Sequence, residues 1–200
     1  MNDDQLLKRA NKGDEAAFLL LYERHRAALF RFAYRMLNSV HAAEDITQDC
    51  FLSLIRQPER FNAARASLRT YLFAMGRNLV LKHFRDSGYE ITVDDLPEEP
   101  ILRHTPEPLD LLLSEEVSSK VRQAVADLPP LQREALVLFE YEELSLAEIA
   151  AVVGADVGTV KMRLHRAREQ LRRVLAPYFK SDWVVTGAER YEPKGMRDEQ

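Results

Sequence analysis

With 200 residues, 46% of them hydrophobic and 30% charged, the chain can form one large folded domain or two small ones. No apolar run approaches the roughly 18 residues of a membrane span, and the polar N-terminus is unlike a signal peptide, so we expect a cytoplasmic protein without membrane insertion. The single cysteine, Cys50, excludes an internal disulfide and a cysteine-based metal cluster.

The net charge of −4 is unevenly distributed along the chain. Ten acidic residues and one arginine lie between Asp86 and Glu116, so this segment carries −9 and the rest of the chain carries +5. Because salt confines the field of a charged patch to about 10 Å, local charge decides which partners a surface attracts. The overall acidity therefore does not exclude a nucleic-acid partner.

Two helices are predicted near the start of the chain. Residues 1–13 are expected to be a polar lead-in, and an uninterrupted apolar pattern over residues 14–37 predicts a long core helix. A second helix is expected over residues 42–57, and Pro58 ends it.

Acidic and amide side chains gather in the first half of the second helix, at Glu44, Asp45, Gln48 and Asp49. Acids near a helix N-terminus are stabilised by the helix dipole, which is a purely structural explanation. The same side chains could form a docking face for a basic partner. The residues alone favour neither interpretation.

A third helix, Leu68–Arg85, combines aromatic and basic side chains. At the α-helical period, Phe73, Arg77 and Phe84 fall together opposite the apolar stripe that begins at Leu68. Such a face suits stacking on unpaired bases with phosphate contacts alongside. A helix buried on two sides, with its aromatics in the core, would show the same pattern, so both interpretations stay open.

Residues 86–114 differ in character from their surroundings. They are acidic, contain four prolines and lack periodicity, which predicts a flexible linker. The expected fold is therefore all-α, with helical domains over residues 1–85 and 115–178 and a C-terminal tail over residues 179–200.

The second domain is expected to open with helices over residues 114–127 and 131–141. The motif that follows, over residues 145–173, is the best defined in the chain. It consists of two short amphipathic helices around a tight turn, the second of them densely basic.

Local signals mark both helices of this motif. Ser145 and Glu148 form a capping box, Gly154 supplies the positive φ that ends a helix, and Asp156 is the expected N-cap of the second helix. The pattern predicts a helix-turn-helix that reads duplex DNA, with an ordinary helical hairpin as the alternative. The apolar stripe of the second helix comprises Val160, Leu164, Ala167, Leu171 and Val174. Its other side carries Lys161, Arg163, Arg166, Arg168, Arg172 and Arg173.

Together these features resemble the extracytoplasmic-function (ECF) group of bacterial RNA polymerase sigma factors. The resemblance covers about residues 14–176. It rests on four motifs in the family's order: AEDITQDCFL (43–52), YLFAMGRNLVLKHFR (71–85), LPPLQREALVL (128–138) and LSLAEIAAVVGADVGTVKMRLHRARE (144–169). The resemblance implies a transcription initiation factor that binds core RNA polymerase, directs it to promoters and helps to melt the minus-ten element.

The resemblance also implies the site residues and partners. The acidic helix would dock on the polymerase clamp through Asp45, Gln48 and Asp49. The third helix, with the loop Glu59–Ala66, would hold the melted non-template strand of the minus-ten element through Arg69, Tyr71, Phe73, Arg77, Asn78 and Lys82. The helix-turn-helix would read the minus-thirty-five duplex through Thr159, Lys161, Met162, Arg163, His165 and Arg166. An anti-sigma factor is a further partner that the family implies.

Four positions depart from the usual family pattern. Tyr71 stands where tryptophan is common, Gly76 where alanine is usual, Glu143 where glycine is common and Met162 where a small polar residue is frequent. Met162 bears on which promoter sequence is read.

Two other function classes are weaker. A helix-turn-helix regulator that binds duplex operators without polymerase would require a sensor or dimerisation domain in the N-terminal half. An enzyme is not expected, because the chain has no glycine-rich phosphate loop, no nucleophile motif and no metal-spaced His/Cys set. We therefore expect no catalytic residue, cofactor or metal.

Overall fold

The computed structural model describes residues 1–89 and 113–178. Within these ranges the chain forms helices and no β-strand, and none of the helices is long and apolar enough to cross a membrane. The expected linker lies outside the described residues from 90 to 112, as does the expected tail over residues 179–200.

The helices before residue 90, here called the N-terminal half, form a bundle in which α2 contacts α1, α3 and α4. The three longest begin at polar caps: the side chains of Asp14, Ser39 and Ser67 each accept the N–H of the residue three positions later. The helices are α1 (Asp3–Ala10), α2 (Glu15–Leu37), α3 (Val40–Arg56), the short 3₁₀ turn η1 (Pro58–Arg60) and α4 (Leu68–Asp86).

Residues 1–13 are not a polar lead-in, because α1 packs on α2. Leu6 and Leu7 are buried, and the carboxylate of Asp3 lies 2.7 Å from Nε2 of His25. An eight-residue helix is marginal by itself and depends on tertiary contacts. These contacts explain why the local pattern did not predict it.

Gly76 allows α4 to lie close to α2. A Cβ at this position would stand 2.7 Å from Cδ1 of Leu29 and 3.9 Å from Sγ of Cys50, and both side chains are buried. Glycine inside a helix costs about 1 kcal/mol relative to alanine. Close packing against Leu29 is a physical reason for the glycine here.

The C-terminal half, residues 113–178, begins its second helix with Pro130, whose missing N–H costs nothing in a first turn. The helix predicted over residues 131–141 is continuous only to Leu136 and then widens into a π segment. The elements are α5 (Leu113–Ala126), α6 (Pro130–Leu136), the π segment η2 (Val137–Tyr141), α7 (Leu146–Val153), α8 (Val157–Leu175) and the 3₁₀ turn η3 (Ala176–Tyr178).

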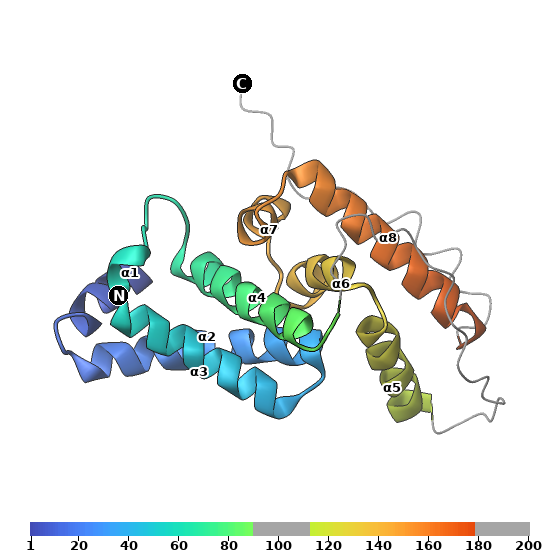
Figure 1. Ribbon diagram of the computed structural model, residues 1–200, viewed down its shortest axis with the longest axis horizontal. Helices are drawn as coiled ribbons and strands as arrows, with labels where there is room; N and C mark the ends of the chain where they lie inside the picture. The colour runs from blue at the N-terminus through green and yellow to red at the C-terminus, as the bar shows by residue number, and fades with distance from the viewer. Residues whose placement is uncertain (90–112, 179–200) are drawn as a thin grey trace.

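The two halves pack directly on each other. Figure 1 shows α4 facing α6 and α7 across the middle of the molecule, and α7 lies against α4 while α5 and α6 contact α2. Most of the buried apolar side chains of both halves belong to one continuous cluster that extends from Leu6 to Ala167. The interface is therefore part of the core in this state.

Glu143, which connects the π segment to α7, has a left-handed backbone conformation with φ 53°. This conformation raises the free energy of a residue with a Cβ by about 1–2 kcal/mol, whereas glycine adopts it without strain. This is a physical reason for the glycine that the family pattern has at this position.

Replacing Glu143 by glycine should therefore stabilise the protein. Relief of about 1–2 kcal/mol of strain exceeds the roughly 0.5–1 kcal/mol entropic cost of glycine, so we expect a net gain of about 0.5–1 kcal/mol in urea unfolding. Glu23→Gly, at an exposed site inside α2, is the matched control and should lower stability by about 1 kcal/mol. Equal losses for both variants would contradict the assigned strain.

Candidate nucleic-acid and polymerase interfaces

One face of α3 is acidic and exposed. Asp45, Gln48 and Asp49 are exposed, whereas their chain neighbours Ile46 and Cys50 are buried. Burial raises the pKa of the Cys50 thiol to about 12, so this cysteine is an unreactive core side chain at neutral pH. The structure thus brings the three predicted polymerase-docking residues together on one surface.

A groove between α2 and α3 lies beside this acidic face. Phe18 and Tyr22 line it from α2, and Phe51, Ile55 and the acidic-face residue Gln48 line it from α3. The rings of Tyr22 and Phe51 meet edge to face, 4.9 Å apart between centroids. Glu44 makes the α3 edge of this groove acidic, whereas Arg26 and Arg31 make its α2 edge basic. An apolar floor of this kind suits an amphipathic helix whose basic side chains lie toward α3. This groove could not be predicted from the sequence, because it depends on how two helices align.

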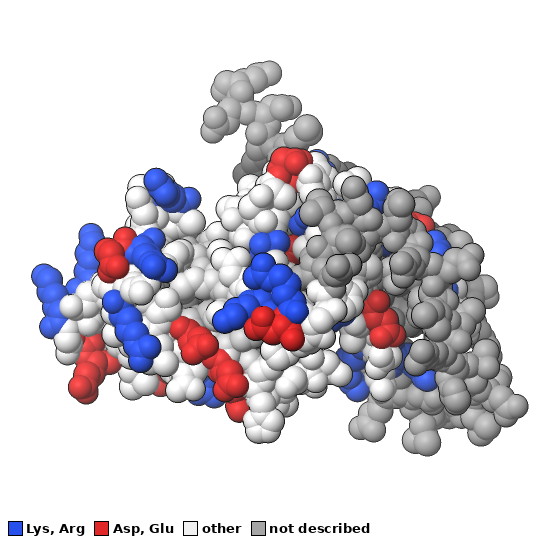
Figure 2. Space-filling model, viewed as in Figure 1, with Lys and Arg blue, Asp and Glu red and all other residues white. Residues whose placement is uncertain are grey.

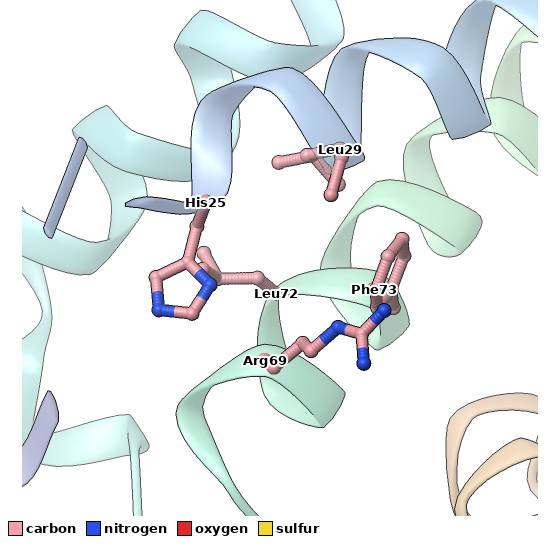
Figure 3. A pocket seen from close by; sticks show the side chains of 6 residues that line it. His25, Leu29, Arg69, Leu72 and Phe73 are labelled. Carbon is pink, nitrogen blue, oxygen red and sulfur yellow. The ribbon is translucent and has the colours of Figure 1, made fainter. Parts of the chain in front are cut away.

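Phe73 does not lie on an outward face of α4, so its expected placement is wrong. Its side chain is 2% exposed, and its ring meets that of Phe32 edge to face at 5.6 Å. A cavity of about 10 Å³ beside it has room for at most one water molecule, so it cannot receive a nucleobase. Figure 3 shows the labelled side chains that line this cavity, which are His25, Leu29, Arg69, Leu72 and Phe73. Of the two interpretations of α4, burial on two sides is confirmed.

Arg69 and Arg77 extend from α4 toward the C-terminal half. The guanidinium of Arg77 donates two hydrogen bonds to the carboxylate of Glu134 on α6, at 2.8 and 3.2 Å. Arg163 of α8 pairs with the same carboxylate at 3.2 Å. Arg69 donates to the main-chain carbonyl of Glu142. In this state, protein groups pair with two of the three cations that were predicted to contact the minus-ten strand, Arg69 and Arg77.

The loop before α4 carries its own aromatic and basic residues. The ring of Phe61 lies 5.3 Å from that of Tyr71, which is half-buried, and burial raises the pKa of the Tyr71 phenol. Arg60 and Arg65 are exposed on the same loop. The loop as a whole was predicted to hold the melted strand, but none of these three residues was singled out, although an aromatic flanked by arginines is a readable signal.

Asn78 and Lys82 are the exposed members of the predicted minus-ten set. Figure 2 shows lysine and arginine side chains gathered over the region where α4 approaches the C-terminal half, with acidic side chains next to them. Positive charge on α4 is thus only partly open to solvent.

The helix-turn-helix forms as predicted. The Ser145 hydroxyl accepts from the N–H of Glu148, whose carboxylate accepts the N–H of Ser145 at 2.9 Å. Gly154 has φ 65°, and Asp156 caps α8 by accepting the N–H of Thr159 at 2.8 Å. The start and end predicted for α7 and the N-cap predicted for α8 are confirmed.

Not every basic residue of α8 is available to DNA. Arg163 is turned inward onto Glu134, and the hydroxyl of Thr159 donates to Asp156 at 2.7 Å. Val174, expected to face inward, is 37% exposed. The predicted minus-thirty-five residues that the helix presents outward are Lys161, Met162 and His165, with Arg166 half-buried.

The candidate sites described above are exposed surfaces of the kind that bind other macromolecules. In residues 1–89 and 113–178 there is no group of three or more His, Cys, Asp or Glu residues that could hold a metal ion. The cavity beside Phe73 is too small for a ligand, and the groove on α2 and α3 is open. The exposed features are an acidic face, an apolar groove, an aromatic and basic loop, and a basic recognition helix.

Comparisons with known proteins identify the family of the chain. The family model for sigma-70 region 2 matches residues 21–89, and that for sigma-70 region 4 matches residues 118–171. The ECF RNA polymerase sigma factor SigW of Bacillus subtilis is 32% identical over 177 residues, which cover 84% of this chain and 94% of SigW. SigC of Mycobacterium tuberculosis is 38% identical over 167 residues, covering 81% of this chain and 85% of SigC. The chain belongs to the ECF sigma factors of RNA polymerase.

Solved structures agree with this assignment. CnrH, solved with the cytosolic domain of CnrY, gives a TM-score of 0.65 at 26% identity, covering 88% of this chain and 97% of CnrH. RpoE of Bartonella quintana, solved with the anti-sigma factor NepR, gives 0.60 at 28% identity, covering 80% and 96%. This sigma factor therefore has the predicted all-α fold with two helical parts. It acts in transcription initiation, and the operator-binding regulator is not favoured.

The burial of Phe73 leads to a stability prediction. Phe73→Ala should lower the free energy of unfolding by about 3–5 kcal/mol, because it removes a buried ring. Asn78→Ala, five residues further along the same helix but exposed, should change it by no more than about 0.5 kcal/mol. Urea unfolding measures both variants. A Phe73→Ala variant as stable as Asn78→Ala would refute the core position of this ring.

Proposed function

We propose that this sigma factor uses three separate surfaces to start transcription. The α3 face binds core RNA polymerase, α8 recognises the minus-thirty-five element, and α4 with its preceding loop holds the melted minus-ten strand. The observation that carries the proposal is the exposed acidic face of α3 beside an apolar groove, since a regulator acting without polymerase would not need it.

The polymerase-binding part of the proposal rests on Asp45, Gln48 and Asp49. Their side chains are exposed beside the groove that Tyr22 and Phe51 line. An α-helical partner would place apolar side chains in this groove and basic side chains against the two carboxylates. A clamp built from helices fits this description.

The minus-ten part of the proposal rests on the loop and on α4. Phe61 and Tyr71 provide aromatic rings, and Arg65 and Lys82 provide exposed cations. Removing a base from the stack costs a few kcal/mol, and stacking on protein aromatics returns about 1–3 kcal/mol per base. Arg69, Arg77 and Asn78 complete the proposed strand-binding set, and Phe73 supports it from the core.

The minus-thirty-five part of the proposal rests on the N-terminal half of α8, where a recognition helix contacts base edges. Lys161, Met162, His165 and Arg166 are the proposed contacts, with Thr159 at the helix start. Arg163 is assigned to holding α8 on α6 through Glu134.

The remaining assignments follow the family. We assign residues 1–85 to sigma region 2, residues 86–114 to a linker, residues 115–178 to sigma region 4 and residues 179–200 to a tail. The protein acts without catalysis of its own, in the cytoplasm where polymerase works. An anti-sigma factor is a proposed partner, supported by the structure of RpoE with NepR.

Reversing the charge of the α3 face should abolish polymerase binding. Asp45→Lys with Asp49→Lys replaces attraction by repulsion against a basic partner, so pull-down with core polymerase should fall to background while the circular dichroism melt is retained. The matched control is Glu15→Lys with Glu23→Lys, which reverses two exposed acids on α2. Undiminished binding by the α3 variant would remove the docking assignment.

Arg166→Ala should weaken promoter recognition in a sequence-dependent way. A bidentate arginine–guanine contact is worth about 1–3 kcal/mol, so the holoenzyme should lose about tenfold to a hundredfold in affinity and discriminate less at one base pair. Arg173→Ala, exposed near the end of α8, is the control and should leave base preference unchanged. Binding of holoenzyme to a library of minus-thirty-five sequences measures both. Equal loss on every sequence would make Arg166 a phosphate contact.

A further inference from the structure

The outward face of α8 has an apolar side chain at its centre. One side of this helix packs on α5, α6 and α7 through a buried stripe that includes Val160 and Leu164. At the α-helical period, Met162 falls on the side opposite these two residues, and it is 47% exposed. A single exposed apolar side chain is ordinary on a protein surface. This one is informative because it lies in the part of α8 that a helix-turn-helix inserts into the major groove.

Gly158, one turn before Met162, leaves the space beside that side chain open. A Cβ on Gly158 would stand 2.9 Å from Oδ1 of Asp156, the oxygen that accepts the N–H of Thr159 at the helix start. The cap is thus a physical reason for glycine at this position. Because long side chains on a helix lean toward its N-terminus, we expect that of Met162 to lie over the turn that contains Gly158. The first turns of α8 therefore present an apolar surface at their centre.

Charged side chains surround this apolar centre. Lys161 is exposed next to Met162, and Arg166 is half-buried one turn further along. Cations at such places can pair with the phosphates that border a groove. Glu169, two turns after Met162 on the same side, is paired with Arg172, and a carboxylate is a poor neighbour for phosphates. The segment of α8 that faces bases therefore lies before Glu169, with Met162 near its middle.

Few groups in the major groove suit an apolar side chain. Guanine, adenine and cytosine present hydrogen-bond donors and acceptors there, whereas thymine also presents its C5 methyl group. A donor or acceptor buried against Met162 would lose its water without gaining a partner, which costs free energy. Contact with the methyl group instead removes apolar surface of both partners from water. The chemistry of this position therefore favours thymine.

We propose that Met162 reads the C5 methyl group of a thymine in the minus-thirty-five element. The inference rests on the proposed function, because α8 must enter the major groove for Met162 to reach a base. It makes Met162 a specificity-determining residue for one base pair. A small polar side chain, which is frequent at this position in the family pattern, would not supply the contact. The preference for thymine at this base pair is therefore a property of this chain and not of the fold.

Base preferences of the holoenzyme locate the contact. Wild-type and Met162→Ser holoenzymes are each bound to a library of minus-thirty-five sequences. The wild type should prefer thymine at one base pair, and Met162→Ser should lose the preference at that pair alone. Met162→Leu keeps an apolar side chain and should keep the preference. Val174→Ser, the matched control, replaces an exposed apolar side chain near the end of α8 and should change no preference.

Replacing this thymine by deoxyuridine isolates the methyl group. Deoxyuridine keeps the base pair and the O4 acceptor and lacks only the C5 methyl group. Burying one such group corresponds to about a fourfold change in affinity, so the wild-type holoenzyme should bind the deoxyuridine promoter about fourfold more weakly. Met162→Ser holoenzyme should bind both promoters equally, and Met162→Leu should retain the difference. Competition binding measures each pair of promoters.

The outcomes separate this inference from the proposed function. Circular dichroism melts establish that the variants are folded, and deoxyuridine at each thymine in turn tests the wild type even if a variant is unstable. Equal wild-type affinity for thymine and deoxyuridine promoters, or a Met162→Ser preference unchanged from the wild type, would overturn the reading of a methyl group by Met162. A wild-type holoenzyme without base preference anywhere in the minus-thirty-five element would instead refute the proposed function of α8, and this inference with it.

Discussion

The buried carboxylate of Glu134 constrains how the helices of this protein fit together. It pairs with Arg77 from one half and Arg163 from the other, while burial raises the pKa of its carboxyl against the opposing effect of both arginines. A buried carboxylate that loses its partners costs about 3–5 kcal/mol, so α6 must keep at least one arginine beside it. The pairing fixes the positions of α4 and α8 relative to α6. It therefore also fixes the position of the proposed minus-ten helix, α4, relative to the minus-thirty-five helix, α8.

Features encoded within a few residues were predictable from the sequence. The turn of the helix-turn-helix is one example: Ser145, Gly154 and Asp156 act through hydrogen bonds and backbone angles that span no more than five residues. The acidic face of α3 is another, because residues spaced by three and four positions share a side of any helix. The family resemblance added the functional meaning of these segments, and the comparisons bear out the family itself.

Features that depend on distant partners were not predictable. The helical period shows which residues of α4 share a side, but it does not show which parts of the protein cover that side. Phe73 was therefore predicted to face outward, although it packs against Phe32 in the core. Arg77 was read as a free cation, yet its partner Glu134 lies 57 residues further along the chain. The groove beside α3 and the helix α1 likewise depend on packing against α2. Gly76 and Glu143, which looked like departures from a pattern, have separate causes in close packing and backbone strain.

The central claim is that this chain supplies promoter recognition and opening to polymerase, and run-off transcription with permanganate footprinting tests it most directly. The account predicts a transcript, and permanganate-reactive thymines in the minus-ten region, only when core polymerase, this sigma factor and a cognate promoter are all present. Tight binding of the chain to duplex promoter DNA without polymerase, with no transcript when polymerase is added, would contradict it.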